Sequence, residues 1–260
     1  MNKYILNLKR YKPLLQELVR RDIKVRYRKS VLGVFWTLLS PLLMMIVLSF
    51  VFSNMFKFAV ANYPVYILSG QVVFNFFSES TNASMTSIIN NAQLIKKVYI
   101  PKYILTISSV VSSIINVMAS FTALILVMVA MRSELHYTMI ISFIPLLVLF
   151  VFATGIGLIL ASYSVKFRDI THFYSVFLTA LMYLMPVIYP MSIVENVPIV
   201  NNIVAWNPLT IILNTFRDLV MNGVIENIFP FFIVSIISFL VLILGFFVFY
   251  KKQDTFIMDL

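Results

Sequence analysis

The chain has 260 residues, of which 61% are hydrophobic and 12% are charged. A soluble globular domain is about 45–50% apolar and about 25% charged, so this composition indicates a protein that lies in lipid. The chain contains no cysteine, which excludes disulfides, thiolate metal sites, iron–sulfur clusters and cysteine nucleophiles. The net charge of +10 reflects the sidedness of the loops of a membrane protein and does not indicate a nucleic-acid partner.

The first prediction concerns membrane-spanning helices, each of which needs about 20 mainly apolar residues. Stretches with few or no charged residues predict six of them, at approximately 31–56, 64–88, 103–131, 138–163, 172–190 and 229–250. The remaining uncharged stretch, 196–216, is interrupted by Asn and Pro residues and fits a lipid-facing helix poorly. We therefore predict an all-α polytopic membrane protein in which 191–228 is a partly re-entrant outer segment.

The distribution of Lys and Arg predicts the orientation of these spans. Of the 20 basic residues, ten lie in 1–29 and seven more in the loops and tail on the same side of the predicted spans. Only Lys57, Arg132 and Arg217 fall on the opposite side. Since cytoplasmic loops collect Lys and Arg, both termini are predicted to lie in the cytoplasm, flanking a transmembrane domain over 31–250. The residues 1–30 form the cytoplasmic N-terminus, 251–260 form the tail, and no cleavable signal peptide is predicted.

The sequence lacks the features of an internal motor. Its six glycines form no phosphate-binding G-x-x-x-x-G-K loop, and no soluble segment is long enough for a nucleotide-binding domain. No cofactor is therefore expected in this chain, and any ATP-driven work requires a partner subunit that binds ATP and Mg²⁺.

One charged cluster, FRDITH, precedes the fifth predicted span and contains Arg168, Asp169 and His172. The favoured interpretation is a cytoplasmic helix cap made by Arg168 and Asp169, because a carboxylate suits a helix N-terminus. The alternative is the centre of a membrane enzyme that acts on polyprenyl phosphates.

Residues 13–29 predict an amphipathic helix at the membrane interface, with Pro13 in its first turn. Its cations form an arc away from the leucines, while Arg26 and Lys29 break the pattern; the arc contains Arg20, Arg21, Lys24 and Arg28. Two interpretations fit: an anchor for the first span, or a binding surface for the anionic headgroup of a lipid-linked substrate.

The loop 90–102 mixes apolar residues with lysines and is too apolar for a merely solvated connection. We interpret it as a docking surface for a soluble partner, with a headgroup-level turn as the alternative. The candidate contact residues are Leu94, Lys96, Lys97, Tyr99, Ile100 and Pro101.

Two further features fall within or beside the predicted spans. Glu79 is the one carboxylate placed inside a span, where its charge favours the bundle interior or a watery path. Phe35 and Trp36, at the start of the first span, fit either an interfacial aromatic belt or the lining of a sugar path.

The order of several motifs resembles the ABC-2 type permeases that export polysaccharides, O-antigens and teichoic acids. The segment RRDIKVRYRKSVLGVFWTLLSPL, at 20–42, carries the R-D-x-K-x-R-Y run, the L-G-x-x-W pattern and the Pro typical of their first span. Further similarity lies in LIKKVYIPK at 94–102, FRDI at 167–170, PVIYP at 186–190 and WNPL at 206–209.

This resemblance implies a homodimer of six-helix subunits bound to two ATPase subunits. It implies that 94–102 is the coupling helix, that 13–29 is a gate helix, and that the substrate is a polysaccharide on polyprenyl pyrophosphate passing between the first and fifth spans. By the same likeness an outer gate includes Pro186, Tyr189, Pro190, Asn207 and Pro208. An ABC-2 exporter of drugs or small lipids remains an alternative, as does the membrane enzyme.

Overall fold

A computed structural model describes residues 11–28, 30–55, 60, 62–195 and 197–260. These residues form helices and connecting segments without a strand, which confirms the predicted all-α class. The predicted basic positions Lys3, Lys9, Arg10, Lys29 and Lys57 lie outside the described residues.

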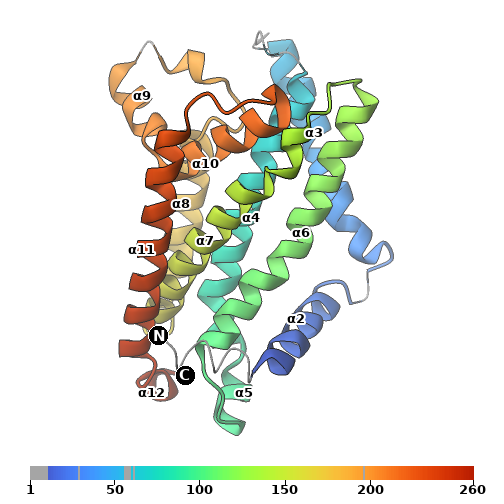
Figure 1. The fold of residues 1–260 in the computed structure, drawn as a ribbon. Coiled ribbons are helices and arrows are strands. Elements are labelled where there is room, and N and C mark those ends of the chain that lie inside the picture. Colours follow the sequence, from blue (N-terminus) through green and yellow to red (C-terminus); the bar gives the residue numbers. More distant parts are fainter. Residues whose placement is uncertain (1–10, 29, 56–59, 61, 196) are drawn as a thin grey trace.

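Six helices make up the body of the molecule (Figure 1). They are α3 (Trp36–Met55), α4 (Tyr63–Asn90), α6 (Tyr103–Ala130), α7 (Phe143–Ser164), α8 (Ile170–Leu184) and α11 (Ile228–Lys252). Among the described residues, four helical stretches are long and apolar enough to cross a membrane: Gly33–Ser53, Tyr103–Ala130, Tyr137–Ser164 and Ile228–Lys252. The chain is therefore a multi-pass membrane protein.

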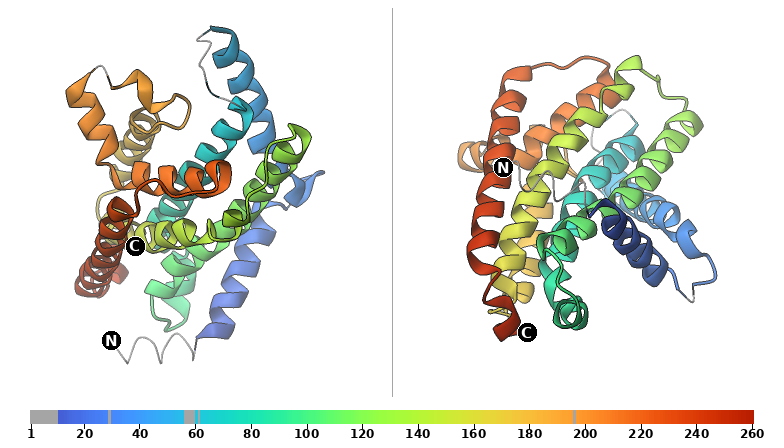
Figure 2. Two further views of the ribbon diagram at one scale, coloured as in Figure 1. Left: turned by 45° about the horizontal axis from the view of Figure 1, so that its top comes forward. Right: turned by 60° about the horizontal axis from the view of Figure 1, so that its bottom comes forward.

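The short helices gather at the two ends of this body. At one end lie α2 (Lys12–Arg26), α5 (Ala92–Lys97) and α12 (Phe256–Asp259), and at the other lie α9 (Pro198–Ala205) and α10 (Pro208–Arg217) (Figures 1 and 2). The π-helical turn η4 (Asp218–Asn222) continues α10 and leads towards α11. Three 3-10 turns complete the fold: η1 (Gly33–Phe35), η2 (Tyr137–Ile140) and η3 (Met191–Ile193).

The helix α8 ends at Leu184, whereas a fifth span was predicted to continue to residue 190. Pro186 explains the difference, since a residue that precedes proline is disfavoured in the α conformation. Met185 accordingly has φ −92° and ψ 144°, which is extended backbone.

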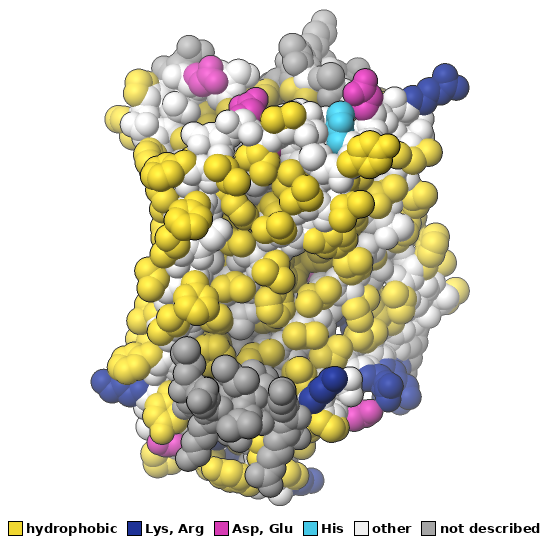
Figure 3. All heavy atoms as spheres, in the orientation of Figure 1, with side chains coloured by type: hydrophobic (Ala, Val, Ile, Leu, Met, Phe, Trp, Pro, Cys, Tyr) yellow, Lys and Arg dark blue, Asp and Glu magenta, His cyan; other side chains and the backbone are white. Residues whose placement is uncertain are grey.

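The core is built around α4, which packs against α6 and α7, while α11 packs on the other side of α7. Eighteen of the 28 residues of α4 are buried, so it is the central helix of the bundle. Apolar side chains cover the visible flank between the two ends, and Lys and Arg side chains gather mainly near the end that carries α2 and α12 (Figure 3). This pattern of an apolar belt between charged ends is that of a protein embedded in a bilayer.

Candidate functional site: the α2 groove and the two ends of the bundle

The helix α2 lies against the bundle through its leucines. Pro13 occupies its first turn, and Leu18 is buried in a cluster that also includes Ile95 and Phe249. Leu14 and Leu15 are partly buried against the same cluster, and α2 packs along α6. The amphipathic pattern therefore positions α2 beside α6 with its cations directed away from the leucines.

The four predicted cations are exposed, but α2 ends at Arg26, so Arg28 lies beyond the helix that was predicted to continue to residue 29. The Nη1 atom of Arg20 is 2.9 Å from the Oε1 atom of Glu17, and the Nη2 atom of Arg21 is 2.8 Å from the Oδ1 atom of Asp22. Lys24 and Arg28 are exposed and form no ion pair within the described part of the chain. These cations are accessible to an anionic headgroup.

Arg26, which breaks the pattern of the arc, forms the contact that joins α2 to α4. Its Nη1 atom donates to the Oε1 atom of Glu79, and the Nδ2 atom of Asn116 on α6 donates to the same oxygen. The hydroxyl of Tyr27 then donates to the Oδ1 atom of Asn116 over 3.1 Å. Burial raises the pKa of the Tyr27 phenol above its usual range.

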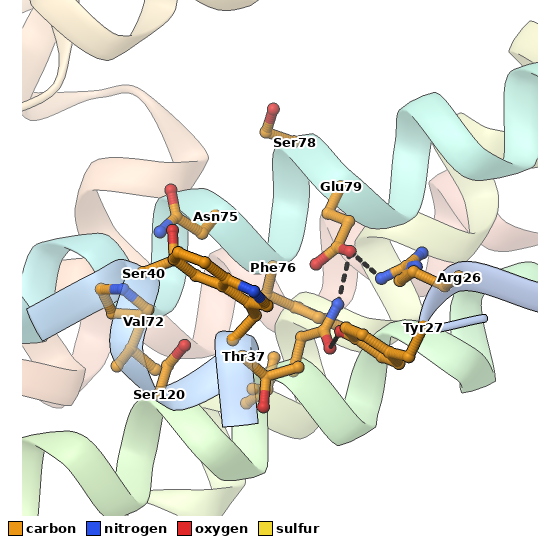
Figure 4. A pocket seen from close by; sticks show the side chains of 14 residues that line it. Arg26, Tyr27, Thr37, Ser40, Val72, Asn75, Phe76, Ser78, Glu79 and Ser120 are labelled. Carbon is orange, nitrogen blue, oxygen red and sulfur yellow. Dashed lines mark hydrogen bonds and ion pairs between the residues drawn. The ribbon is translucent and has the colours of Figure 1, made fainter. Parts of the chain in front are cut away.

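The carboxylate of Glu79 therefore has protein partners and is not directed only into lipid. It lines a cavity of about 410 Å³ between α2, α3, α4 and α6 (Figure 4). Its lining is mostly polar and includes Thr37, Ser40, Asn75, Ser78 and Ser120. Trp36 also lines this cavity, whereas Phe35 is 57% exposed and belongs to the turn before α3. Of the two aromatic candidates, Trp36 is the one that the structure brings to the polar cavity.

The predicted docking loop divides into an inner and an outer face. Ile95 and Ile100 are buried in the same cluster as Leu18, and Leu94 and Pro101 are partly buried. Lys96, Lys97 and Val98 are exposed, and Tyr99 is 97% exposed. The exposed surface of this loop is therefore the strip 96–99, whereas Ile100 packs against the bundle.

A contact between the end of this loop and the C-terminal residues was not predicted from the sequence. The Nζ atom of Lys102 donates to the carbonyl oxygen of Gln253 and lies 5.6 Å from the centroid of the Phe256 ring. Phe256 is buried, and its ring centroid is 5.3 Å from that of Phe249. Burial lowers the pKa of the Lys102 ammonium group. No local pattern marks this contact, because Lys102 and Gln253 are 151 residues apart in the sequence.

Arg168, Asp169 and His172 do not assemble into a catalytic centre. All three are exposed, and no hydrogen bond or ion pair joins their side chains among the described residues. Asp169 immediately precedes α8, but its side chain accepts no capping hydrogen bond from the helix. Any favourable effect of its charge on the helix is thus an interaction with the dipole alone.

At the opposite end, the WNPL motif begins α10. The Oδ1 atom of Asn207 accepts a hydrogen bond of 3.0 Å from the backbone nitrogen of Leu209, and Pro208 takes the first helical position. This is the arrangement expected for an Asn–Pro helix start. It fixes the point at which the chain turns back from α9 into α10.

Arg217, at the end of α10, holds the irregular segment that follows α8. Its Nη1 atom donates to the carbonyl of Pro186 over 2.6 Å, and its Nη2 atom donates to those of Val187 and Tyr66, each over 3.1 Å. Its Nε atom donates to the hydroxyl of Ser69 over 3.1 Å, and its Cζ atom lies 3.6 Å from the centroid of the Tyr66 ring. Arg217 was predicted only as an outer basic residue, and its partners lie too far away in sequence for local pattern to reveal them.

Tyrosines of α4 satisfy the other carbonyls of this segment. The hydroxyl of Tyr66 donates to the carbonyl of Tyr189 over 2.9 Å, and that of Tyr63 donates to the carbonyl of Ile188 over 2.6 Å. Pro190 then begins the turn η3 with extended backbone. These bonds explain how a non-helical stretch is accommodated within a membrane protein, because backbone groups there need internal partners.

The fold is that of a polytopic membrane protein in which the amphipathic helix α2 and the partly buried loop 90–102 lie at the same end of the bundle. The chain belongs to the ABC-2 type transporter family, whose sequence model matches residues 13–221. Its family is one of transport proteins.

Named relatives cover nearly the whole chain. An O-antigen export system permease protein RfbA of Klebsiella pneumoniae is 30% identical over 247 residues, which are 94% of this chain and 93% of the relative. A protein of the same name from Myxococcus xanthus is 26% identical over 98% of both chains. The polysialic acid transport protein KpsM of Escherichia coli is 25% identical over 83% of this chain and 84% of its own.

Proposed function

We propose that this chain is the permease subunit of an ATP-driven exporter that moves a polysaccharide linked to polyprenyl pyrophosphate across the bacterial cytoplasmic membrane. The observation that carries the proposal is the similarity, over 94% of the chain, to a permease named for O-antigen export. The exposed cations of α2 support an anionic lipid-linked substrate, since ammonium and guanidinium groups form charge-assisted hydrogen bonds with phosphate oxygens.

The proposed assembly is a homodimer with two ATPase subunits, which bind the ATP and Mg²⁺. In each copy α3, α4, α6, α7, α8 and α11 serve as the six spans, and α9 and α10 form the re-entrant outer gate with 186–190. Both termini face the cytoplasm. The apolar faces that α3 and α8 leave exposed in one copy support a second copy packed beside them around the conduit.

The proposed motor contact is the strip 96–99. ATP would bind one arrangement of the two ATPase subunits more tightly than the other and so favour it. This change of arrangement would shift α4 and α6, which are attached to the strip. We expect Tyr99→Asp together with Lys97→Glu to abolish co-purification of the ATPase, because both an apolar anchor and a cation are lost.

The matched control is Tyr137→Asp, which alters a tyrosine that is 94% exposed on the turn η2. The connection between α6 and α7, which contains η2, lies at the end of the bundle opposite α5 (Figure 1). If the double variant Tyr99→Asp/Lys97→Glu still co-purified with the ATPase, this docking surface would be refuted. The same conclusion would follow if the control Tyr137→Asp lost the ATPase to the same extent.

The class of substrate is tested in cells that lack their own export permease and express this protein. The measurement is the amount of polysaccharide that reaches the cell surface. Changing Arg20, Arg21 and Lys24 together to Glu should reduce export by at least tenfold while the ATPase still co-purifies. The control Lys251→Glu changes an exposed cation of the tail and should retain export. Undiminished export by the triple variant would exclude the headgroup role of α2.

A further inference from the structure

The C-terminal tail, residues 253–260, folds back against the bundle. After α11 the chain turns and forms α12, which lies beside α5 (Figures 1 and 2). Phe256 is 1% exposed and belongs to the buried cluster that also contains Ile95 and Ile100 of the loop 90–102. Terminal residues are usually poorly ordered unless they are tied down, so this attachment distinguishes the tail from a frayed chain end.

Lys102, at the end of the loop 90–102, makes two further contacts with the tail. Its Nζ atom donates to the carbonyl oxygen of Gln253, and the same atom lies 5.6 Å from the centroid of the Phe256 ring. The loop and the tail are therefore packed together as one unit, although they are far apart in the sequence.

The outer side of this unit is apolar in both of its segments. Ile257 and Met258 follow the buried Phe256 and are 55% and 80% exposed, because adjacent residues of a helix point in different directions. In the strip 96–99, Val98 is 49% exposed and Tyr99 is 97% exposed. The same end of the bundle thus presents two exposed pairs of large apolar side chains.

These side chains follow the basic residues that mark the edge of the membrane. The last turn of α11 carries Lys251 and Lys252, and Lys and Arg side chains gather mainly at this end of the molecule (Figure 3). Lysines at the end of an apolar helix lie at the membrane interface, so the tail follows the apolar part of the span. Exposed apolar side chains beyond the lipid favour a protein partner.

The size of the strip 96–99 is a second argument that the docking surface extends beyond it. A stable protein interface takes about 800 Å² and roughly 20–30 residues from each partner, far more than this strip supplies alone. The tail is the exposed apolar segment that packs against the same loop. A partner seated on the strip therefore lies next to the tail.

We propose that the C-terminal tail and the strip 96–99 form one docking surface for the ATPase subunit. Ile257 and Met258 supply its added apolar contacts, and Phe256 is the positioning residue that holds them beside the loop. This inference rests on the proposed function, whose motor contact it enlarges. The partner surface that fits is an apolar recess bordered by carboxylates, because the strip also carries exposed lysines.

The test is a thiol footprint, which is possible because the chain has no native cysteine. Single thiols are placed in the tail by Met258→Cys, in the strip by Tyr99→Cys and on the turn η2 at the opposite end by Tyr137→Cys. All three parent side chains are at least 80% exposed, so the substitutions do not disturb the core. The rate of labelling by a water-soluble maleimide is compared, in detergent, between the chain alone and its complex with the co-expressed ATPase.

We expect the ATPase to slow the labelling of Met258→Cys and of Tyr99→Cys at least tenfold and to leave that of Tyr137→Cys unchanged. If Tyr99→Cys were protected and Met258→Cys were not, the tail would be overturned as a contact while the strip remained one. If the chain bound no ATPase, the proposed function itself would fail, so the two failures are distinguishable.

Lipid is the other candidate to cover the tail, and it is tested on the chain alone. Met258→Cys is labelled in detergent and in nanodiscs of phosphatidylethanolamine and phosphatidylglycerol. We expect similar rates in both. Labelling at least tenfold slower in the nanodiscs would show that lipid covers the tail, and would overturn the proposal.

The positioning role of Phe256 is tested in the background of Met258→Cys. Phe256→Ala should remove most of the protection that the ATPase gives to this thiol, because the small side chain no longer fixes the tail to the loop. Phe256→Leu should restore the protection, since it refills the apolar site. Protection in Phe256→Ala equal to that in the parent background would overturn this role.

A matched pair of charge changes completes the test. Ile257→Asp together with Met258→Asp should reduce the amount of co-purified ATPase at least tenfold, because two charges replace apolar contacts. Lys251→Glu, at an exposed position of α11, should retain the ATPase. Full retention by the double variant would overturn the docking role of the tail.

Discussion

The helices α4 and α11 show two ways in which a helix can belong to a membrane bundle. In α4, 18 of 28 residues are buried, and in α11, 4 of 25 are buried. The buried residues of α4 include Ser69, Gln71, Ser80, Thr81, Ser84 and Ser87. The four residues that α11 buries are Val234, Ser238, Gly245 and Phe249.

Polar side chains connect α4 to its neighbours at several depths. At its outer end Ser69 binds Arg217 of α10, and further along Thr81 accepts a hydrogen bond of 2.7 Å from the hydroxyl of Tyr174 on α8. Ser87 lies 3.0 Å from Thr106 of α6, and Glu79 pairs with Arg26 of α2. Apolarity thus identifies the helices with most lipid contact, whereas α4, whose polar side chains contact α2, α6, α8 and α10, is the more polar helix.

The largest effect is expected where α4 meets α10. Arg217→Met removes four hydrogen bonds; the buried carbonyl of Val187 loses its side-chain donor, and that of Pro186 keeps only the hydroxyl of Tyr66 at 3.2 Å. Because each buried group that loses its partner costs about 1–3 kcal/mol, we expect destabilisation on the order of 3–5 kcal/mol. The measurement is thermal or denaturant-induced unfolding of the purified protein in detergent.

Arg217→Lys is the informative second variant, since it keeps the charge but not the planar group that reaches both sides of the segment. It should recover only part of the loss. If Arg217→Met unfolded at the same temperature as the parent protein, the hydrogen bonds of Arg217 would not contribute measurably to the stability of the fold.

The next effect concerns the attachment of α11 to α7, where two glycines allow close approach. A Cβ atom at Gly245 would lie 2.5 Å from the carbonyl oxygen of Gly155, and one at Gly155 would lie 2.7 Å from the backbone of Val241. Gly245→Leu therefore forces the helices apart, and we expect a loss of about 1–3 kcal/mol. Leu244→Met, at a position that is 51% exposed, is the control that should unfold like the parent.

Sequence pattern predicted the lipid-facing helices well, because their signal is local. The predicted boundaries of the last span lie within two residues of the observed ends of α11. The fifth span was predicted to continue past Pro186, because no charged residue marks the end of α8. Glu79 was correctly singled out as a carboxylate that needs the interior or a watery path, but its partner was not predicted. Arg26 carried a signal, since it broke the amphipathic pattern of its helix.

The contacts of Arg217 could not have been predicted in the same way. Its partners Ser69 and Tyr66 are 148 and 151 residues away in the sequence, and both are common residue types on an ordinary helix. Long-range hydrogen bonds of this kind depend on which helices become neighbours, and no local spacing determines that. The same reason applies to Lys102 and Gln253, which are 151 residues apart.

A smaller effect is expected in the segment between α10 and α11, which leads into the less buried of the two helices compared. Burial, and secondarily the charge of Glu226, raise the pKa of Asp218 above the ordinary 3.8. A carboxyl whose pKa is higher in the folded state is favoured there when protonated, so its contribution to stability falls as pH rises from about 3.8 through the folded pKa.

Asp218→Asn removes this penalty, and the variant should be more stable than the parent at pH 7 by less than about 1 kcal/mol, since the site is partly exposed. Unfolding temperatures measured between pH 4 and pH 7 should diverge in favour of the variant as pH rises. A difference that is independent of pH, or that grows towards low pH, would show that the Asp218 charge is not destabilising.

The smallest effect is expected on the exposed face of α11, and it tests the other half of the comparison. Phe247 is 65% exposed, and lipid tails are about as apolar as the side chain itself. Phe247→Leu should therefore change stability by no more than about 0.5 kcal/mol and leave export unchanged.

A destabilisation as large as that of Gly245→Leu would mean that protein, not lipid, covers this face of α11, and the homodimer would then have to be built through α11 and not beside α3 and α8. Measuring Phe247→Leu at two detergent-to-protein ratios separates these cases, because a protein contact between copies is lost on dilution whereas a lipid contact is not.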